Sequence, residues 1–195
     1  SYSLGLNKKY DVASGDEEVR KGGVEYLKRI VEKIAVMEGE LFSGVTFAGW
    51  GLPDHFVDEA EKRALFERSA ESMREVMKTA EKEGVTVCVE AVNRFESPLI
   101  NTAEEALRYA DMVDSPNIGI HLDTYHMNIE ENSIGEAIRK AGKRLRHFHT
   151  GENNRNIPGR GHIDWDEVFG ALKEIGYERN IVSEPFLICL LYTSP

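Results

Sequence analysis

Four acidic or imidazole side chains stand at the ends of four strand-like segments. They are Glu90, Asp123, His149 and Glu184. An ionised carboxylate on a buried strand is costly unless it is paired or binds a cation. Equivalent ends of consecutive parallel strands converge, so we expect these side chains to meet at one point. One such residue alone would be a salt-bridged structural acid; the four together predict a metal site.

The ligand types indicate which ion and which chemistry such a site favours. Three carboxylates and one imidazole form an oxygen-rich set, which favours Mn²⁺, Mg²⁺ or Co²⁺ over structural zinc and does not rank the three. A cation polarises a ketone and neutralises an enediolate, while one carboxylate removes a proton and another returns it. If Glu90 and Glu184 flank a planar enediolate on opposite faces, the carbon between them is inverted, which is epimerisation.

The elements that position these residues alternate along the chain between strand and helix patterns. The strand-like segments are 1–6, 41–48, 85–92, 118–122, 145–150 and 181–184. Capping boxes predict helix starts at Ser14 with Glu17 and at Thr102 with Glu105. Gly84 is typical of the left-handed residue that ends a helix. This alternation predicts parallel strands joined by right-handed crossovers.

Two architectures fit such an alternation, an open doubly wound sheet and a (β/α)₈ TIM barrel. No Gly-x-Gly-x-x-Gly follows the first segment, which disfavours a nucleotide-binding sheet. The polar residues instead cluster at the carboxyl ends of strands, where barrel enzymes build their sites. The sequence therefore predicts an α/β TIM barrel that is incomplete, with about six βα units.

Composition excludes several other classes of protein. The net charge of −10 over 195 residues disfavours nucleic-acid binding. No apolar run reaches the roughly 20 residues that span a bilayer, so we expect no membrane association. The two cysteines show no metal or redox spacing, which indicates a reduced, cytoplasmic protein.

Four motifs carry a resemblance to a known family. They are Glu-Ala-Val-Asn-Arg-Phe-Glu at 90–96, His-Leu-Asp-Thr-Tyr-His-Met-Asn-Ile-Glu-Glu at 121–131, His-Phe-His-Thr-Gly-Glu-Asn-Asn-Arg at 147–155 and Ser-Glu-Pro-Phe at 183–186. The chain resembles the ketose 3-epimerases, the D-tagatose 3-epimerase and D-psicose (D-allulose) 3-epimerase group, from about Ser1 to Phe186. The resemblance implies a metal, typically Mn²⁺ or Co²⁺, held by the four residues named above, with Glu90 and Glu184 as the acid/base pair at C3.

The resemblance also implies a set of residues that bind the substrate, a free ketose. Glu96, His126 and Arg155 would contact the sugar around C1 to C3. Trp50, in the loop after the second strand, would pack over it. His147 is expected to be either a residue that supports the metal ligands or a hydrogen-bonded core histidine, His121 is expected to be structural, and the loop 156–162 is expected to form a lid.

Simpler interpretations of three substrate residues stay open at this point. Glu96 could form a loop ion pair with Arg94. His126 could only cap the turn after Asp123. Arg155 could be a solvated loop residue.

The resemblance implies an eight-stranded barrel whose first two strands and last helix have no counterpart in this sequence. We therefore expect a partial barrel domain over 1–188. Residues 189–195 look like a translated transposon-derived sequencing adapter, which predicts a non-native tail on a fragment cut at both ends. Such a fragment would expose two sheet edges and could be inactive alone. Family members are commonly homo-oligomers, either dimers or tetramers.

Other functions remain open beside ketose 3-epimerisation. Within the same superfamily, the chain could be an aldose–ketose isomerase, a hydroxypyruvate isomerase or an inosose dehydratase. A DNA-repair endonuclease on this barrel would need a histidine-rich multi-zinc site and a basic face, and the charge speaks against it. A non-catalytic binding domain would leave the four convergent ligands unexplained.

Overall fold

The computed structural model describes residues 1–185, which form one parallel sheet with helices packed against it. The six strands lie in sequence order, and each neighbouring pair is parallel. They are β1 (Tyr2–Gly5), β2 (Leu41–Val45), β3 (Thr86–Glu90), β4 (Ile118–Asp123), β5 (Leu145–Thr150) and β6 (Ile181–Ser183). The predicted alternation and its six parallel strands are confirmed.

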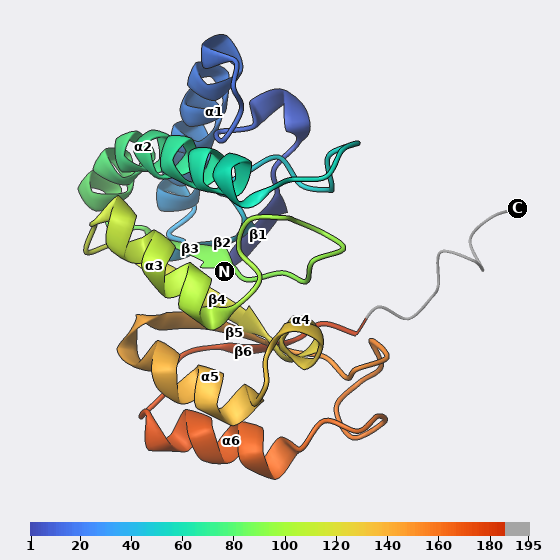
Figure 1. Cartoon of the computed structure of the whole chain (residues 1–195). Coiled ribbons are helices and arrows are strands. Elements are labelled where there is room, and N and C mark those ends of the chain that lie inside the picture. Colours follow the sequence, from blue (N-terminus) through green and yellow to red (C-terminus); the bar gives the residue numbers. More distant parts are fainter. Residues whose placement is uncertain (186–195) are drawn as a thin grey trace, which may run out of the picture.

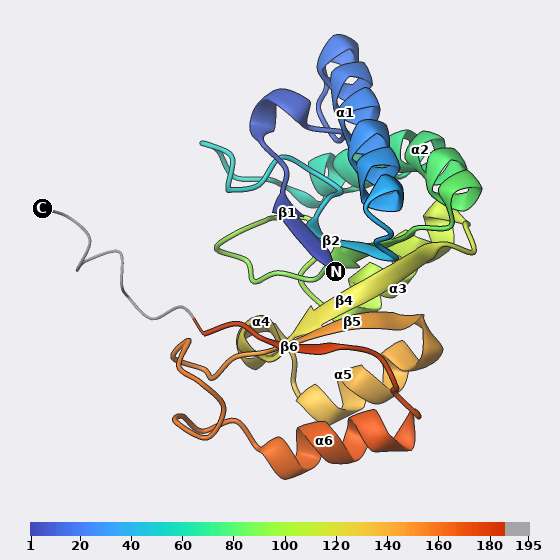
Figure 2. The same cartoon turned by 180° about the vertical axis from the view of Figure 1, so that it is seen from behind.

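The helices lie around the outside of the curved sheet, as two opposite views show (Figures 1 and 2). They are α1 (Glu17–Val36), α2 (Glu59–Glu83), α3 (Ala103–Val113), α4 (Thr124–Glu130), α5 (Ile134–Ala141) and α6 (Trp165–Glu174), with short 3-10 turns at Lys8–Tyr10 and Gly142–Arg144. The sequence did not predict α4. This helix starts directly after β4 because the Asp123 carboxylate accepts a hydrogen bond from the Tyr125 backbone N–H at 2.9 Å.

Two of the three predicted helix signals are confirmed. Thr102 forms its capping box with Glu105, and Gly84 ends α2 with a φ of 70°. The predicted cap at Ser14 is wrong, because α1 is capped by Asp16. The Asp16 carboxylate accepts from two backbone N–H groups of the first turn, whereas the Ser14 hydroxyl accepts from the backbone of Asp16 itself.

The central strands carry apolar side chains on one face and polar side chains on the other. Alternate residues of a strand point to opposite faces. Val87 and Val89 of β3 belong to the buried apolar core, together with Met77 of α2 and Tyr109 of α3. Each such aliphatic side chain stabilises the fold by roughly 1.5–3 kcal/mol through burial. The opposite face of these strands is left for polar groups.

The polar residues lie at the carboxyl-terminal end of the parallel strands. The loops that follow the strands project toward one end of the molecule (Figure 1). Within residues 1–185, β1 and β6 each pair with a single strand, so the sheet is an open arc. The tail predicted at 189–195 lies outside the described residues.

Candidate metal centre

The structure brings together the four side chains that the sequence places at strand ends. Glu90 ends β3, Asp123 ends β4, His149 lies near the end of β5, and Glu184 follows β6 directly. One ligand atom of each lies within 4.8 Å of the corresponding atoms of the other three. The cause is the parallel register, which sets Asp123 opposite His149 on neighbouring strands.

This group places three carboxylates close together in a largely buried environment. Burial and the carboxylates of Asp123 and Glu184 raise the pKa of Glu90 well above its ordinary value. Burial also raises the pKa of Asp123, against the influence of His126 and Arg155. Burial alone would raise the pKa of Glu184 too, but His149 and Arg155 outweigh it and lower that pKa. Additional positive charge at this point would stabilise all three carboxylates.

One nitrogen of the group also lacks a hydrogen-bond partner. His149 Nδ1 is buried without a hydrogen bond and lies 3.3 Å from Glu184 Oε2. A buried polar atom left unsatisfied costs about 1–3 kcal/mol. Three carboxylates beside one unsatisfied imidazole nitrogen fit a divalent cation that prefers oxygen ligands. Glu90, Asp123, Glu184 and His149 Nδ1 would hold it.

Arg155 reaches the same carboxylates from the loop after β5. Its Nη1 lies 2.8 Å from Asp123 Oδ2 and 3.2 Å from Glu184 Oε2. Its guanidinium carbon lies 3.8 Å from the centre of the Tyr125 ring. The interpretation of Arg155 as a solvated loop residue is therefore wrong. Instead, the guanidinium partly neutralises the acidic group.

Glu152 organises the loop that carries Arg155, a role that the sequence analysis did not assign to it. Its buried carboxylate accepts hydrogen bonds from Trp165 Nε1 at 2.6 Å, Gly159 N at 2.7 Å and Ile163 N at 3.2 Å. These bonds outweigh the effect of burial and lower the pKa of Glu152. In the sequence, Glu152 is an acidic residue in a polar loop. An acidic residue in such a loop is usually solvated, so the sequence alone does not indicate its role.

His126 lies in α4, and its ring faces the site from the side. Its Nδ1 accepts hydrogen bonds from Asn93 Nδ2 at 2.8 Å and from Asn93 N at 3.1 Å. His126 Nε2 lies 3.9 Å from Glu90 Oε1 and 3.3 Å from Arg155 Nη2. Burial lowers the pKa of His126 to about 4. Nδ1 therefore accepts from Asn93, and Nε2 is the nitrogen turned toward the carboxylates.

Glu96 and Trp50 complete the set of residues predicted to bind substrate. Both line a cavity of about 330 Å³ with Glu90, His126 and Arg155. Trp50 is half exposed, and Glu96 accepts a hydrogen bond from Asn93 Nδ2 at 3.0 Å. The alternative ion pair of Glu96 with Arg94 is wrong, because Arg94 pairs with Glu130 at 2.8 Å.

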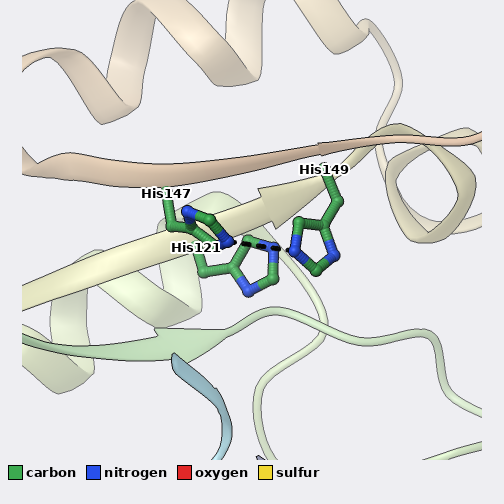
Figure 3. A group of neighbouring side chains, drawn as sticks. All are labelled: His121, His147 and His149. Carbon is green, nitrogen blue, oxygen red and sulfur yellow. Dashed lines mark hydrogen bonds between the residues drawn. The ribbon is translucent and has the colours of Figure 1, made fainter. Parts of the chain in front are cut away.

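Three buried imidazoles, those of His121 from β4 and of His147 and His149 from β5, form a cluster (Figure 3), and His149 belongs also to the group of four described above. His147 Nε2 and His149 Nε2 are 3.0 Å apart, and Ser43 Oγ lies 2.9 Å from His121 Nδ1. Burial lowers the pKa of His147 to about 4 and that of His121 well below its ordinary value. His147 and His121 are thus buried and each makes one hydrogen bond, as expected for supporting or structural histidines, while His121 Nε2 has no hydrogen-bond partner among the described residues.

Comparison with protein families agrees with this architecture. The chain belongs to the xylose isomerase-like TIM barrel family, whose model matches residues 1–188. The fold prediction of a TIM barrel of which this chain forms an incomplete part is thereby confirmed. In the described residues, no helix is long and apolar enough to cross a membrane.

Individual relatives confirm the resemblance to ketose 3-epimerases. D-psicose 3-epimerase of Ruminiclostridium cellulolyticum is 43% identical over 183 residues, which are 94% of this chain and 62% of that protein. L-ribulose 3-epimerase of Mesorhizobium japonicum is 40% identical, over 94% of this chain and 61% of that protein. The crystal structure of D-psicose 3-epimerase with D-tagatose from Clostridium cellulolyticum H10 has a TM-score of 0.90 at 43% identity, covering 94% of this chain and 63% of that one. The chain thus spans about three fifths of the length of these relatives.

Proposed function

We propose that the polypeptide carrying this sequence epimerises a free ketose at C3 with the help of a divalent cation. The observation that carries the proposal is the convergence of Glu90, Asp123, His149 and Glu184 at one end of the sheet. Relatives named D-psicose 3-epimerase and L-ribulose 3-epimerase support this choice of reaction. We propose Mn²⁺ as the cation, with Co²⁺ or Mg²⁺ as substitutes.

The proposed reaction removes a proton from one face of C3 and adds a different proton to the opposite face. A divalent cation bound at the site would polarise the C2 carbonyl and neutralise the negative charge that develops on its oxygen. One of the pair Glu90 and Glu184 removes the C3 proton, and the electron pair of the C–H bond becomes the double bond of the enediolate. The other carboxylic acid protonates C3 from the opposite face. The two groups thereby exchange protonation states, and proton exchange with solvent restores them before the next turnover.

The surrounding residues would bind and orient the sugar. The cavity of about 330 Å³ beside the carboxylates lies in the range of small-molecule sites. His126, through Nε2, and Arg155 would hydrogen-bond to sugar oxygens near C1 to C3, while Glu96 would accept a hydrogen bond from a hydroxyl. Trp50 would cover the apolar face of the sugar ring. We further propose a cytoplasmic protein that forms homo-oligomers, as a dimer or a tetramer.

Deuterium exchange tests the proposal. The polypeptide, at the full length of its relatives, would be incubated with Mn²⁺ and D-fructose, D-psicose or D-tagatose in D₂O. We expect deuterium at C3 together with the C3 epimer, and loss of both in Glu184→Gln. Absence of exchange at C3 with every ketose, or full activity of Glu184→Gln, would overturn the mechanism.

The same spectra identify the competing reactions of this family. An aldose–ketose isomerase would introduce deuterium at C1 of the ketose. This carbon lies next to the C2 carbonyl and becomes the aldehyde carbon of the aldose. The 3-dehydro-D-guloside 4-epimerase of Escherichia coli, 32% identical to this chain and covered over 68% of its length, acts by its name at C4. Exchange at C1 or C4 in place of C3 would assign the chain to one of these reactions.

A further inference from the structure

The two histidines of β5 contact each other through the same type of nitrogen. His147 and His149 point to the same face because they are two residues apart on a strand. Their Nε2 atoms are 3.0 Å apart, the distance of an N–H···N hydrogen bond (Figure 3). In such a contact one nitrogen carries the proton and the other presents a lone pair, so the pair has two possible arrangements.

The neighbouring carboxylates distinguish these two arrangements. His149 Nδ1 is the nitrogen that lies 3.3 Å from Glu184 Oε2 and has no hydrogen-bond partner. A nitrogen binds a cation only through a free lone pair, so the proton of a neutral His149 must then reside on Nε2. His147 Nε2 must accept that proton in its hydrogen bond, and the proton of His147 must reside on Nδ1.

We propose that His147 is a positioning residue that fixes the Nε2–H tautomer of His149 and thereby turns the Nδ1 lone pair toward the three carboxylates. The inference rests on the proposed metal site and adds a residue that controls it. Residues that hydrogen-bond to a liganding imidazole orient the ring and set its tautomer, and their loss typically weakens metal binding by about 10–100-fold.

The packing around the pair holds the two rings in place. The His121 ring stands edge-on to that of His149, with ring centres 4.0 Å apart, and lies 4.7 Å from that of His147. Close packing on this side restrains both rings in the orientation that keeps the hydrogen bond. His147 also lines a cavity at the opposite end of the strands, where water can accept the Nδ1–H of the proposed tautomer.

The tautomer can be read directly in the chain as it stands. ¹⁵N NMR of histidine-labelled protein, recorded with and without Mg²⁺, distinguishes Nε2–H from Nδ1–H. We expect a single Nε2–H tautomer for His149 and an Nδ1–H tautomer for His147. An Nδ1–H tautomer at His149 would overturn the proposal without any variant being made.

Two variants of His147 test the effect on metal binding. His147→Leu removes the acceptor and keeps a buried apolar volume, and we expect Mn²⁺ affinity by calorimetry to fall by about 10–100-fold. His147→Gln restores an acceptor oxygen near the Nε2 position, so its Mn²⁺ affinity should lie closer to that of the native chain. Phe148→Leu is the matched control, because it truncates a buried ring on the other face of the same strand. It should lower the melting temperature and leave the Mn²⁺ affinity unchanged.

The outcomes separate this proposal from the proposed function. Unchanged Mn²⁺ affinity in His147→Leu would overturn the positioning role even if deuterium exchange at C3 is observed. Loss of a second bound Mn²⁺ in His147→Leu would also overturn it, because His147 would then be a ligand itself. The expected tautomer and affinities, found without exchange at C3, would support the positioning role and reject the reaction.

Discussion

The two faces of the same strands bury opposite kinds of side chain, apolar on the outer face and ionisable on the inner face. On the outer face of β3 to β5, Val89 and Phe148 are fully buried among apolar helix residues. On the inner face, Glu90, His121 and His147 are almost as deeply buried, yet each is ionisable. Burial of apolar side chains on the outer face stabilises the fold. Burial on the inner face disfavours the charged form of each ionisable group. The comparison indicates that the outer face determines stability and the inner face serves ligand binding.

The largest expected effect of a substitution is a loss of stability on the outer face. Phe148→Ala should lower the free energy of unfolding by about 3–5 kcal/mol, because it opens a cavity in the apolar core. The Mn²⁺ affinity of the molecules that stay folded should not change. Urea denaturation and calorimetric titration measure the two quantities separately. A loss of affinity as large as the loss of stability would mean that the two faces are not independent.

The next effect lies on the inner face and has the opposite sign for stability. Glu90→Gln should weaken Mn²⁺ binding by more than the roughly 100-fold that loss of a supporting residue causes. The metal-free variant should unfold at a higher temperature than the native chain, because one of three buried, mutually repelling carboxylates is replaced by a neutral group of the same shape. A lower melting temperature of the metal-free variant would contradict this view of the inner face.

A third prediction concerns Glu152, which is buried and holds the loop after β5 through hydrogen bonds. Glu152→Gln should cost about 1–3 kcal/mol at pH 7, because it weakens charge-assisted hydrogen bonds from Trp165 and the loop amides. Since the folded-state pKa of Glu152 lies below its ordinary value, its contribution is present above about pH 4.5 and is lost as the pH falls through the folded-state pKa. The variant should therefore lose less stability than the native chain on acidification. Equal losses in pH-dependent urea denaturation would reject this role.

The smallest expected effect is at the rim of the cavity. Trp50 is 51% exposed, so Trp50→Ala should change the free energy of unfolding by no more than about 0.5 kcal/mol. If Trp50 packs over the sugar, KM for the ketose should rise while kcat changes less, as for a loss of uniform binding. A fall in kcat at constant KM would place Trp50 in the reaction itself.

The sequence predicted the outer face and the frame of the site because both depend on local pattern. Alternation gave the six strands, and the parallel order then implied that the ends carrying Asp123 and His149 meet. The sequence did not predict the interactions that depend on contacts between segments far apart in the chain. The hydrogen bond from Trp165 Nε1 to the Glu152 carboxylate, and those from the Arg155 guanidinium to Asp123 and Glu184, form only after the loop has folded. Local competition explains the wrong cap at Ser14, since Asp16 is also a strong N-cap residue.

The most direct test of the account is the position of Mn²⁺ in a crystal of this chain, located by its anomalous scattering. We predict a single peak bound by Glu90, Asp123, Glu184 and Nδ1 of His149. The structure contains a second cluster with metal-ligand atoms, formed by His121, His147 and His149. A peak within that imidazole cluster, or no peak at the strand ends at saturating Mn²⁺, would contradict the account.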